Sequence, residues 1–201
     1  MKNIAVLASG EGTNLEAILE AVEERKITGN VALVISDQKG AHALQRAKNH
    51  DIKAQFVDPH LYKSRMEYDR ALVELLKNEA VDLVALAGFM RLLSPLFIDA
   101  FTLRIMNIHP SLLPSFKGLD GVEQALSYGV KVTGCTVHFV DEALDGGPII
   151  LQEAVPIIQR DTVETLHQRI HAAEHRIYPT AIDLFCRDML KVEGRRCLII
   201  D

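Results

Sequence analysis

The sequence predicts an α/β fold in which a mixed, mostly parallel twisted sheet carries helices on both faces. Short apolar runs alternate with helical patterns from residue 4 to about residue 87. Several of these runs, such as residues 81–86, have apolar residues on both faces, which is typical of parallel strands covered on both faces. Beyond residue 130, two longer strand-like runs follow each other without a helix between them, and this indicates an antiparallel pair.

The first half of the chain supplies the parallel part of the sheet, because strands that alternate with helices form βαβ units. We expect strands at residues 4–8, 31–35, 53–57 and 81–87. We expect helices at residues 14–25, 41–49 and 63–78. The N-terminal half is therefore predicted to be Rossmann-like.

The second half begins with a short helix that Ser94 and Pro95 start, since serine is a common N-cap and proline fits the first turn. Further strands are expected at residues 104–108, 133–140 and 149–158, a long helix at 161–185 and a terminal hairpin at 189–200. Asp161 and Thr162 are expected to cap the long helix, and Pro179 is expected to kink it. No repeat or linker interrupts the chain, so we predict a single domain, 1–201, with two lobes that divide near residue 100.

Composition excludes several classes of protein. The chain has 22 Lys and Arg residues against 27 Asp and Glu residues, a net charge of −5, so it has no basic field for nucleic acid or an anionic membrane. Its apolar stretches are shorter than the roughly 20 residues of a membrane helix. The three cysteines, Cys135, Cys186 and Cys197, are odd in number and widely spaced, which fits reduced thiols better than a disulfide framework or a zinc site. We expect a cytoplasmic protein with no metal, no nucleic acid and no membrane partner.

A glycine-rich turn, residues 9–14, stands between the first strand and the first helix. The free N–H groups and the positive dipole end of a helix start favour an anion, so Gly12, Thr13 and Asn14 are candidate phosphate ligands. Leu15 stands where a dinucleotide-binding turn would place its third glycine, and the lysine of a P-loop is missing, so a dinucleotide or ATP is disfavoured. A tight turn without a ligand is the alternative.

Asn107 and His109 are two residues apart in an expected strand, so they project to the same face near its carboxyl end, where α/β proteins bind ligands. An amide donor beside an imidazole can stabilise an oxyanion and transfer a proton. Residues 141–148 form a second polar loop, in which two glycines could direct the carboxylate of Asp145 toward His109. The alternatives are a structural histidine at a strand end and a solvated hairpin turn.

These stretches together resemble the phosphoribosylglycinamide formyltransferases, also called glycinamide ribonucleotide transformylases, a family of folate-dependent enzymes. The matching stretches are residues 9–15, 86–94, 107–114, 134–140, 144–150 and 174–179, in the order of the family. The segment Asn-x-His-Pro-Ser-Leu-Leu-Pro with a later Asp-x-Gly marks the wider group of 10-formyltetrahydrofolate enzymes. The Ser-Gly-x-Gly-Thr-Asn-Leu start narrows the resemblance to this family.

The resemblance implies formyl transfer from 10-formyltetrahydrofolate, a co-substrate, to the amine of glycinamide ribonucleotide in purine biosynthesis, through a tetrahedral intermediate and without a metal. It implies that Asn107 donates to the formyl oxygen, that His109 stabilises the oxyanion and assists proton transfer, and that Asp145 holds the imidazole and passes protons. Lobe 1–100 would bind the phosphate and nucleotide, and lobe 101–201 would bind folate and catalyse the reaction. The partners would be these two small molecules, bound by a monomer or a homodimer.

The resemblance also assigns binding residues. The phosphate and the ribose would contact Gly12, Thr13, Asn14 and Glu174. Folate would contact Met90, Arg91, Leu93, Ile98, Ile105, Val140 and Asp141. For Met90, Leu93 and Ile98, packing in the core is the alternative.

Two positions depart from the pattern of the family. The loop at residues 116–122 lacks a histidine that many relatives carry, and His171 stands where some members have a glutamine that contacts substrate. The alternative functions are a 10-formyltetrahydrofolate hydrolase and a non-catalytic regulator that binds folate or phosphate. A methionyl-tRNA formyltransferase would need a longer chain and a basic surface.

Overall fold

A computed structural model describes residues 1–200 of the chain. The chain divides into two compact units, the first spanning Met1–Met106 and the second beginning at Asn107. The predicted fold class is confirmed: strands alternate with helices, pairing is parallel in the first unit, and antiparallel pairs occur in the second. Each unit is described by itself.

The first unit contains a parallel sheet with the strand order β3-β2-β1-β4. Its strands are β1 (Asn3–Leu7), β2 (Asn30–Ser36), β3 (Ala54–Phe56) and β4 (Leu83–Leu86). β1 is central, because Val6 pairs with Val34 on one side and with Ala85 on the other. Every side chain at residues 4–8 is fully buried, which explains the uninterrupted apolar run in the sequence.

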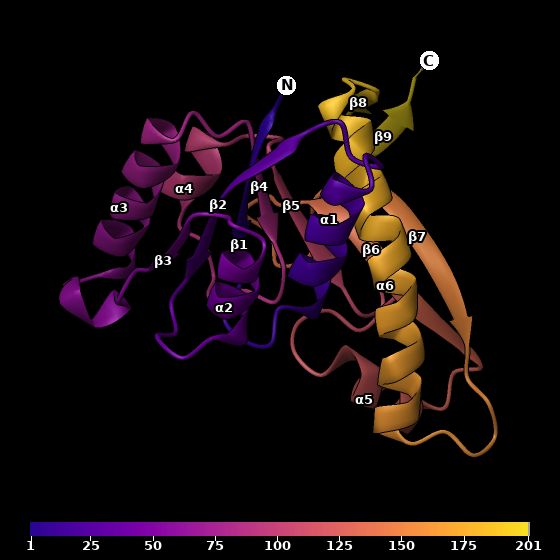
Figure 1. Ribbon diagram of the computed structural model, residues 1–201. Helices are drawn as coiled ribbons and strands as arrows, with labels where there is room; N and C mark the ends of the chain where they lie inside the picture. Colours follow the sequence, from indigo (N-terminus) through magenta and orange to yellow (C-terminus); the bar gives the residue numbers. More distant parts are fainter. Residues whose placement is uncertain (201) are drawn as a thin grey trace. The chain divides into compact units, whose positions relative to one another are not determined.

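Helices cover both faces of this sheet, α1 and α2 on one face and α3 and α4 on the other (Figure 1). They span α1 (Thr13–Glu23), α2 (His42–Asn49), α3 (Arg65–Asn78) and α4 (Pro95–Ala100), with a short 3-10 helix, η1 (Pro59–Leu61), before α3. Ser94 occupies the N-cap position of α4, but its side chain makes no capping hydrogen bond. Its backbone N–H instead donates to Oδ2 of the buried Asp69 at 2.5 Å.

The second unit contains strands in the order β5-β6-β7-β9-β8. They are β5 (Ile105–His109), whose first two residues belong to the first unit, β6 (Val132–Phe139), β7 (Ile149–Pro156), β8 (Leu190–Glu193) and β9 (Arg196–Ile199). The predicted antiparallel pair is β6 and β7, and the predicted terminal hairpin is β8 and β9. β9 also runs parallel to β7, with Ile149 opposite Arg196.

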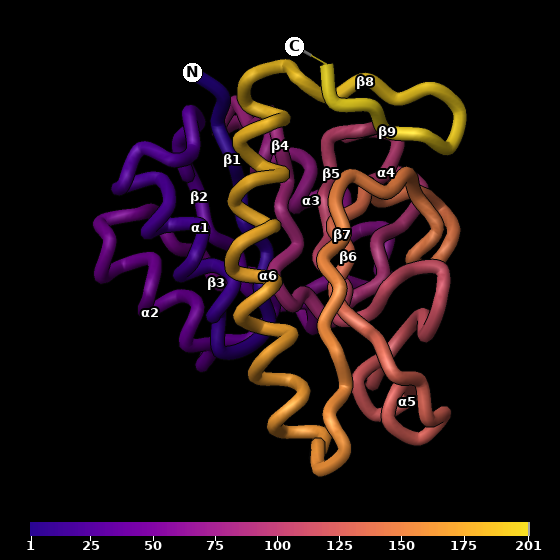
Figure 2. The backbone as a smooth tube through the Cα atoms, turned by 90° about the vertical axis from the view of Figure 1, so that its right-hand side faces the viewer, coloured from indigo at the N-terminus to yellow at the C-terminus, as the bar shows by residue number. Residues whose placement is uncertain are grey.

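Two helices complete the second unit. The long α6 (Val163–Cys186) packs along β6 and β7, as Figure 2 shows. Thr162 caps it as predicted and forms a capping box with Thr165. The backbone N–H of Thr162 donates to Thr165 Oγ1 at 3.0 Å, and the backbone N–H of Thr165 donates to Thr162 Oγ1 at 3.2 Å. Helix α5 (Gly121–Tyr128) was not predicted. Within residues 1–200, no helix has the combination of length and apolarity that crossing a membrane requires.

Candidate active site

The candidate catalytic side chains meet at the end of β5 in the second unit. His109 Nδ1 lies 3.6 Å from Asp145 Oδ2. Asn107 Nδ2 lies 3.2 Å from Nε2 of His138, a β6 residue that lies 3.8 Å from Asp145 Oδ1. The three side chains singled out in the sequence therefore form one cluster, in which His138 is a fourth member.

The ring of His138 fixes the orientation of the Asn107 amide. His138 Nδ1 lies 2.8 Å from the carbonyl oxygen of Phe139, which can only accept, so Nδ1 carries the hydrogen. Burial holds the pKa of His138 below its ordinary value, so the ring is neutral at pH 7 and Nε2 is an acceptor. Asn107 Nδ2 therefore donates one hydrogen to His138 and keeps a second one for another acceptor.

The two nitrogens of His109 face different partners. Nε2 donates to the carbonyl oxygen of Phe116 at 2.8 Å, and Nδ1 is turned toward Asp145. The residue is only 5% exposed, so its ring cannot turn freely toward water. Phe116 has a φ of +52°, in the left-handed region that a bulky residue adopts only when its surroundings hold it there.

The loop after β6 directs Asp145 inward. Asp145 Oδ2 accepts a hydrogen bond from the backbone N–H of Gly118 at 2.7 Å, and the side chain is 10% exposed. A Cβ at Gly147 would lie 1.9 Å from the carbonyl oxygen of Phe139, so only glycine lets the loop pack this closely on β6. The sequence prediction that the glycines of this loop direct the carboxylate inward agrees with this geometry.

One member of the cluster and two residues that contact it were missed in the sequence. Phe116 and Gly118 act through their backbone groups, which no residue type reveals. The loop that holds them was noted only because it lacks a histidine. His138 lies within the matching stretch 134–140, and its alternation with Thr136 along β6 is the signal that could have found it.

The glycine-rich turn of the first unit forms the N-terminus of α1. Gly12 is the N-cap residue with a φ of +72°, and no side chain caps the helix. A Cβ at this position would lie 2.9 Å from Ala43 Cα, so glycine is required. Thr13 and Asn14 are the first residues of α1, at the positive end of the helix dipole. The turn therefore has the local geometry of an anion site.

The residues assigned to folate lie at different depths. Met90 is 69% exposed, so packing in the core does not account for it. The guanidinium of Arg91 lies 5.0 Å above the Tyr68 ring. Ile105 is fully buried. The half-buried members of the set are Leu93, Ile98, Val140 and Asp141.

Helix α6 carries the residue assigned to the ribose. Glu174 is 3% exposed, and its Oε2 lies 3.8 Å from His171 Nε2. His171 lies between His167 and His175, with ring centroids 4.0 and 6.0 Å away. Burial, with a smaller effect of these two histidines, lowers the pKa of His171 to about 4, so its ring is neutral at pH 7.

Residues 2–182 match the sequence model described as formyl transferase. The chain belongs to the formyl transferase family.

Several relatives of this formyl transferase family member have names that describe an activity. This chain is 45% identical over 182 residues to "Phosphoribosylglycinamide formyltransferase" of Bacillus subtilis (strain 168), and the match covers 90% of this chain and 93% of that protein. It is 44% identical over 200 residues to "Trifunctional purine biosynthetic protein adenosine-3" of Bos taurus, covering 98% of this chain but 20% of that protein. The chain thus spans about a fifth of the length of its trifunctional relatives from Bos taurus, Homo sapiens and Gallus gallus.

Solved structures agree with this family assignment. The crystal structure of glycinamide ribonucleotide transformylase 1 from Symbiobacterium toebii superposes with a TM-score of 0.99 at 55% identity, covering 100% of this chain and 95% of that chain. The crystal structure of phosphoribosylglycinamide formyltransferase from Bacillus halodurans gives a TM-score of 0.89 at 48% identity, covering 92% of this chain and 95% of that chain.

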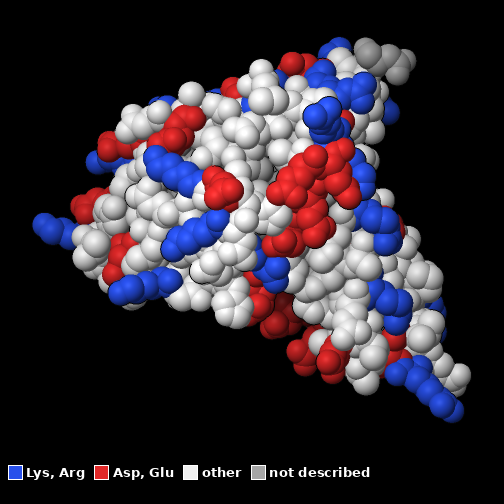
Figure 3. Space-filling view, in the orientation of Figure 1, with Lys and Arg blue, Asp and Glu red and all other residues white. Residues whose placement is uncertain are grey.

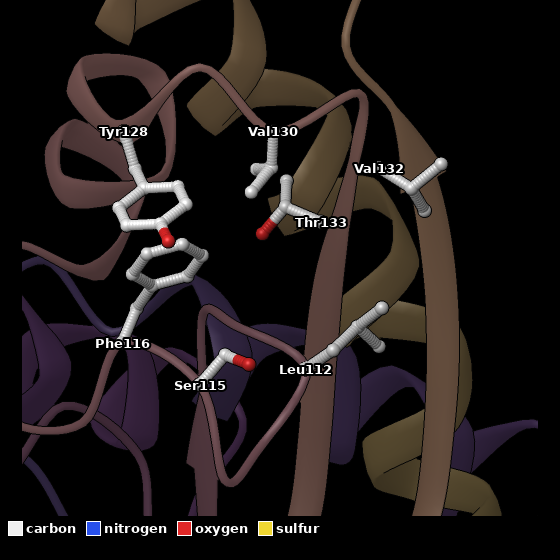
Figure 4. A pocket seen from close by; sticks show the side chains of 7 residues that line it. All are labelled: Leu112, Ser115, Phe116, Tyr128, Val130, Val132 and Thr133. Atoms are coloured by element: carbon white, nitrogen blue, oxygen red, sulfur yellow. The ribbon is translucent and has the colours of Figure 1, made fainter.

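The family member also has an open pocket of about 390 Å³ in its second unit (Figure 4). Its lining residues are Leu112, Ser115, Phe116, Tyr128, Val130, Val132 and Thr133. The rings of Phe116 and Tyr128 pack edge to face on one side of it, with their centroids 5.9 Å apart. Among residues 1–200, no group of three or more His, Cys, Asp and Glu side chains is arranged to hold a metal ion.

Proposed function

We propose that this formyl transferase family member is a phosphoribosylglycinamide formyltransferase. It transfers the formyl group of 10-formyltetrahydrofolate to the amine of glycinamide ribonucleotide, giving formylglycinamide ribonucleotide and tetrahydrofolate in de novo purine biosynthesis. The observation that carries this proposal is the buried cluster of Asn107, His109 and Asp145. The name of the Bacillus subtilis relative, 45% identical over nearly its whole length, supports the choice of substrates.

The cluster suits attack of an amine on a formyl carbon. As the nitrogen–carbon bond forms, an electron pair moves to the formyl oxygen, and the second N–H of Asn107 donates to that oxygen. Asp145 accepts the proton that the amine loses, directly or through water, while it holds His109. The tetrahedral intermediate then expels tetrahydrofolate, whose nitrogen takes up a proton. No covalent bond to the protein forms.

His109 contributes the N–H of Nε2. In the free protein this group donates to the Phe116 carbonyl. In the reacting complex the oxyanion replaces this carbonyl as acceptor, which requires the loop around Phe116 to shift. The strained φ of Phe116 supports such a shift, because strain is released when the loop relaxes.

The binding residues follow the same assignment. Gly12, Thr13 and Asn14 bind the ribonucleotide phosphate at the start of α1, and the buried Glu174 accepts hydrogen bonds from the ribose hydroxyls. The folate co-substrate contacts Met90, Arg91, Leu93, Ile98, Ile105, Val140 and Asp141.

The partners are these small molecules. Both signs of charge are interspersed on the face shown in Figure 3, which supports a small-molecule substrate over a polyanion. The protein acts in the cytoplasm as a monomer or a homodimer. Its cysteines, all three of them free thiols, support an intracellular site.

The test follows the absorbance change of folate deformylation with 10-formyltetrahydrofolate, in the presence and absence of glycinamide ribonucleotide. Deformylation that requires the ribonucleotide is the expected result. Deformylation at the same rate without it would make the protein a hydrolase. No deformylation under either condition would leave a binding role.

A further inference from the structure

The terminal hairpin contacts the loop that carries Asp145. Gly194 and Arg195 connect β8 to β9, and Gly194 has a φ of +62°, which glycine adopts without strain. From this tip, Nη2 of Arg195 donates a hydrogen bond of 2.7 Å to the carbonyl oxygen of Gly146. The hairpin lies beyond residues 2–182, the part of the chain that matches the family. The segment that makes this contact therefore lies outside the match to the formyl transferase family, which ends at residue 182.

The bond reaches the residue next to Asp145. Asp145 has a φ of +46°, and a non-glycine residue in that region needs support from its surroundings. Two of the hydrogen bonds in this loop stay within it: Gly146 N–H donates to Ala143 O, and Ala143 N–H donates to Asp141 Oδ1. Such bonds cannot place the loop relative to β5. The bond from Arg195 ties the loop to an element outside it.

A second contact connects the terminal hairpin to the residue at the start of β7, just beyond the loop. Arg196, the residue after Arg195, pairs through its backbone with Ile149, the first residue of β7. The hairpin is therefore anchored to the strand that follows the loop, and Arg195 extends from this anchor to Gly146. The guanidinium also suits a loop whose three ionisable side chains, Asp141, Glu142 and Asp145, are all acidic.

We propose that Arg195 is a positioning residue that holds the loop at residues 141–147 in the conformation in which Asp145 faces His109. It does not touch substrate and acts through Gly146. The catalytic consequence of this inference rests on the proposed function, whereas the restraint on the loop does not.

Amide hydrogen exchange tests the restraint without any assay of activity. In Arg195→Ala, the amides of Ala143, Gly146 and Gly118 should exchange faster than in the wild type, because the bond from Gly118 to Asp145 is lost when the loop opens. Arg196→Ala removes the same charge from the same hairpin and keeps the backbone pairing, so it should exchange like the wild type. Exchange that is unchanged in Arg195→Ala, or equally faster in both variants, would overturn the proposal.

Steady-state kinetics test the consequence. Arg195→Ala should lower kcat about 10-fold or more, because small displacements of a catalytic group are costly, while the KM of the ribonucleotide changes less than about twofold. Arg195→Lys should recover part of kcat, and Arg196→Ala should match the wild type. Equal kcat in Arg195→Ala and the wild type would refute the positioning role. An inactive wild type would refute the proposed function, and the exchange measurement would still decide whether Arg195 restrains the loop.

Discussion

At the scale of single residues, hydrogen positions decide what the cluster can do. The neutral ring of His138 has one N–H, on Nδ1, which the Phe139 carbonyl oxygen accepts. The Phe116 carbonyl oxygen accepts the Nε2–H of His109. His138 Nε2 is left as the acceptor that orients Asn107, and His109 Nδ1 is left facing Asp145. Each candidate catalytic side chain is thus held by a group that has no role in the proposed reaction.

Removal of His109 or Asp145 should affect turnover far more than folding. His109→Ala and Asp145→Asn should each lower kcat by about 10²-fold or more, the usual effect of a lost acid–base or oxyanion-stabilising group. Measurements of kcat and of the melting temperature check this together. The exposed His60 on η1 provides the control, since His60→Ala should keep the kcat of the wild type. Near-normal kcat in both variants would remove these residues from the mechanism.

The sequence could predict this cluster only in part. Asn107, His109 and Asp145 are identifiable because their residue types suit the chemistry and stand at a strand end or beside glycines. The backbone groups of Phe116 and Gly118 have no such signature, because every residue has an N–H and a C=O. Their roles arise from a φ of +52° and from the path of one loop, which only the folded chain defines.

At the scale of elements, the strands and long helices were predictable because their apolar patterns match their burial; in β1, for example, the continuous apolar run at residues 4–7 coincides with buried positions. Helix α5 lacks these signals. It follows Asp120, whose φ is +59° and whose side chain caps nothing, and it begins with Gly121, a poor helix former. Gly129, with a φ of +84°, is a recognisable C-terminal signal. A C-terminal signal without an N-terminal one does not predict a helix.

The start of α1 gives a prediction about charge. Thr13→Asp should raise the KM of the ribonucleotide about 10-fold, because a carboxylate would repel the phosphate. The same substitution should not lower the melting temperature, since an acidic side chain at a helix N-terminus is favourable. Thr13→Val, which removes the hydroxyl without adding charge, should have a smaller effect, and the KM of folate should not change. An unchanged ribonucleotide KM in Thr13→Asp would contradict the phosphate assignment.

Helix α6 gives a prediction about pH and stability. The folded-state pKa of His171 is about 4, below its unfolded value near 6.5. At pH values between these two pKa values, the unfolded chain therefore binds the proton more strongly than the folded chain. The stability that neutral His171 contributes is lost as the pH falls from about 6.5 to 4. His167, His175 and Glu174 face the ring, and the first two add to this effect.

Chemical denaturation at several pH values between 7 and 4 measures this effect. Because the His171 side chain is 33% exposed, its contribution is about 1 kcal/mol once solvent screening is considered. On acidification, the free energy of unfolding of His171→Gln should fall by about 1 kcal/mol less than that of the wild type. His60→Gln, a substitution at an exposed histidine, should follow the wild type. The same pH dependence in His171→Gln and the wild type would contradict the assignment of this loss to His171.

At the scale of the whole molecule, the two units contribute different chemistry. The first unit carries the helix start suited to a phosphate, and the second carries the groups suited to acyl transfer. The proposed function names glycinamide ribonucleotide because this substrate has both a phosphate and a nucleophilic amine. A hydrolase would transfer the formyl group to water instead.

The fate of the formyl carbon distinguishes these cases most directly. The protein is incubated with 10-formyltetrahydrofolate that has ¹³C in its formyl group, together with glycinamide ribonucleotide, and the product is examined by ¹³C NMR. The proposed function predicts that the label appears as the formyl amide of the ribonucleotide. Label that accumulates as formate while the ribonucleotide stays unmodified would contradict it.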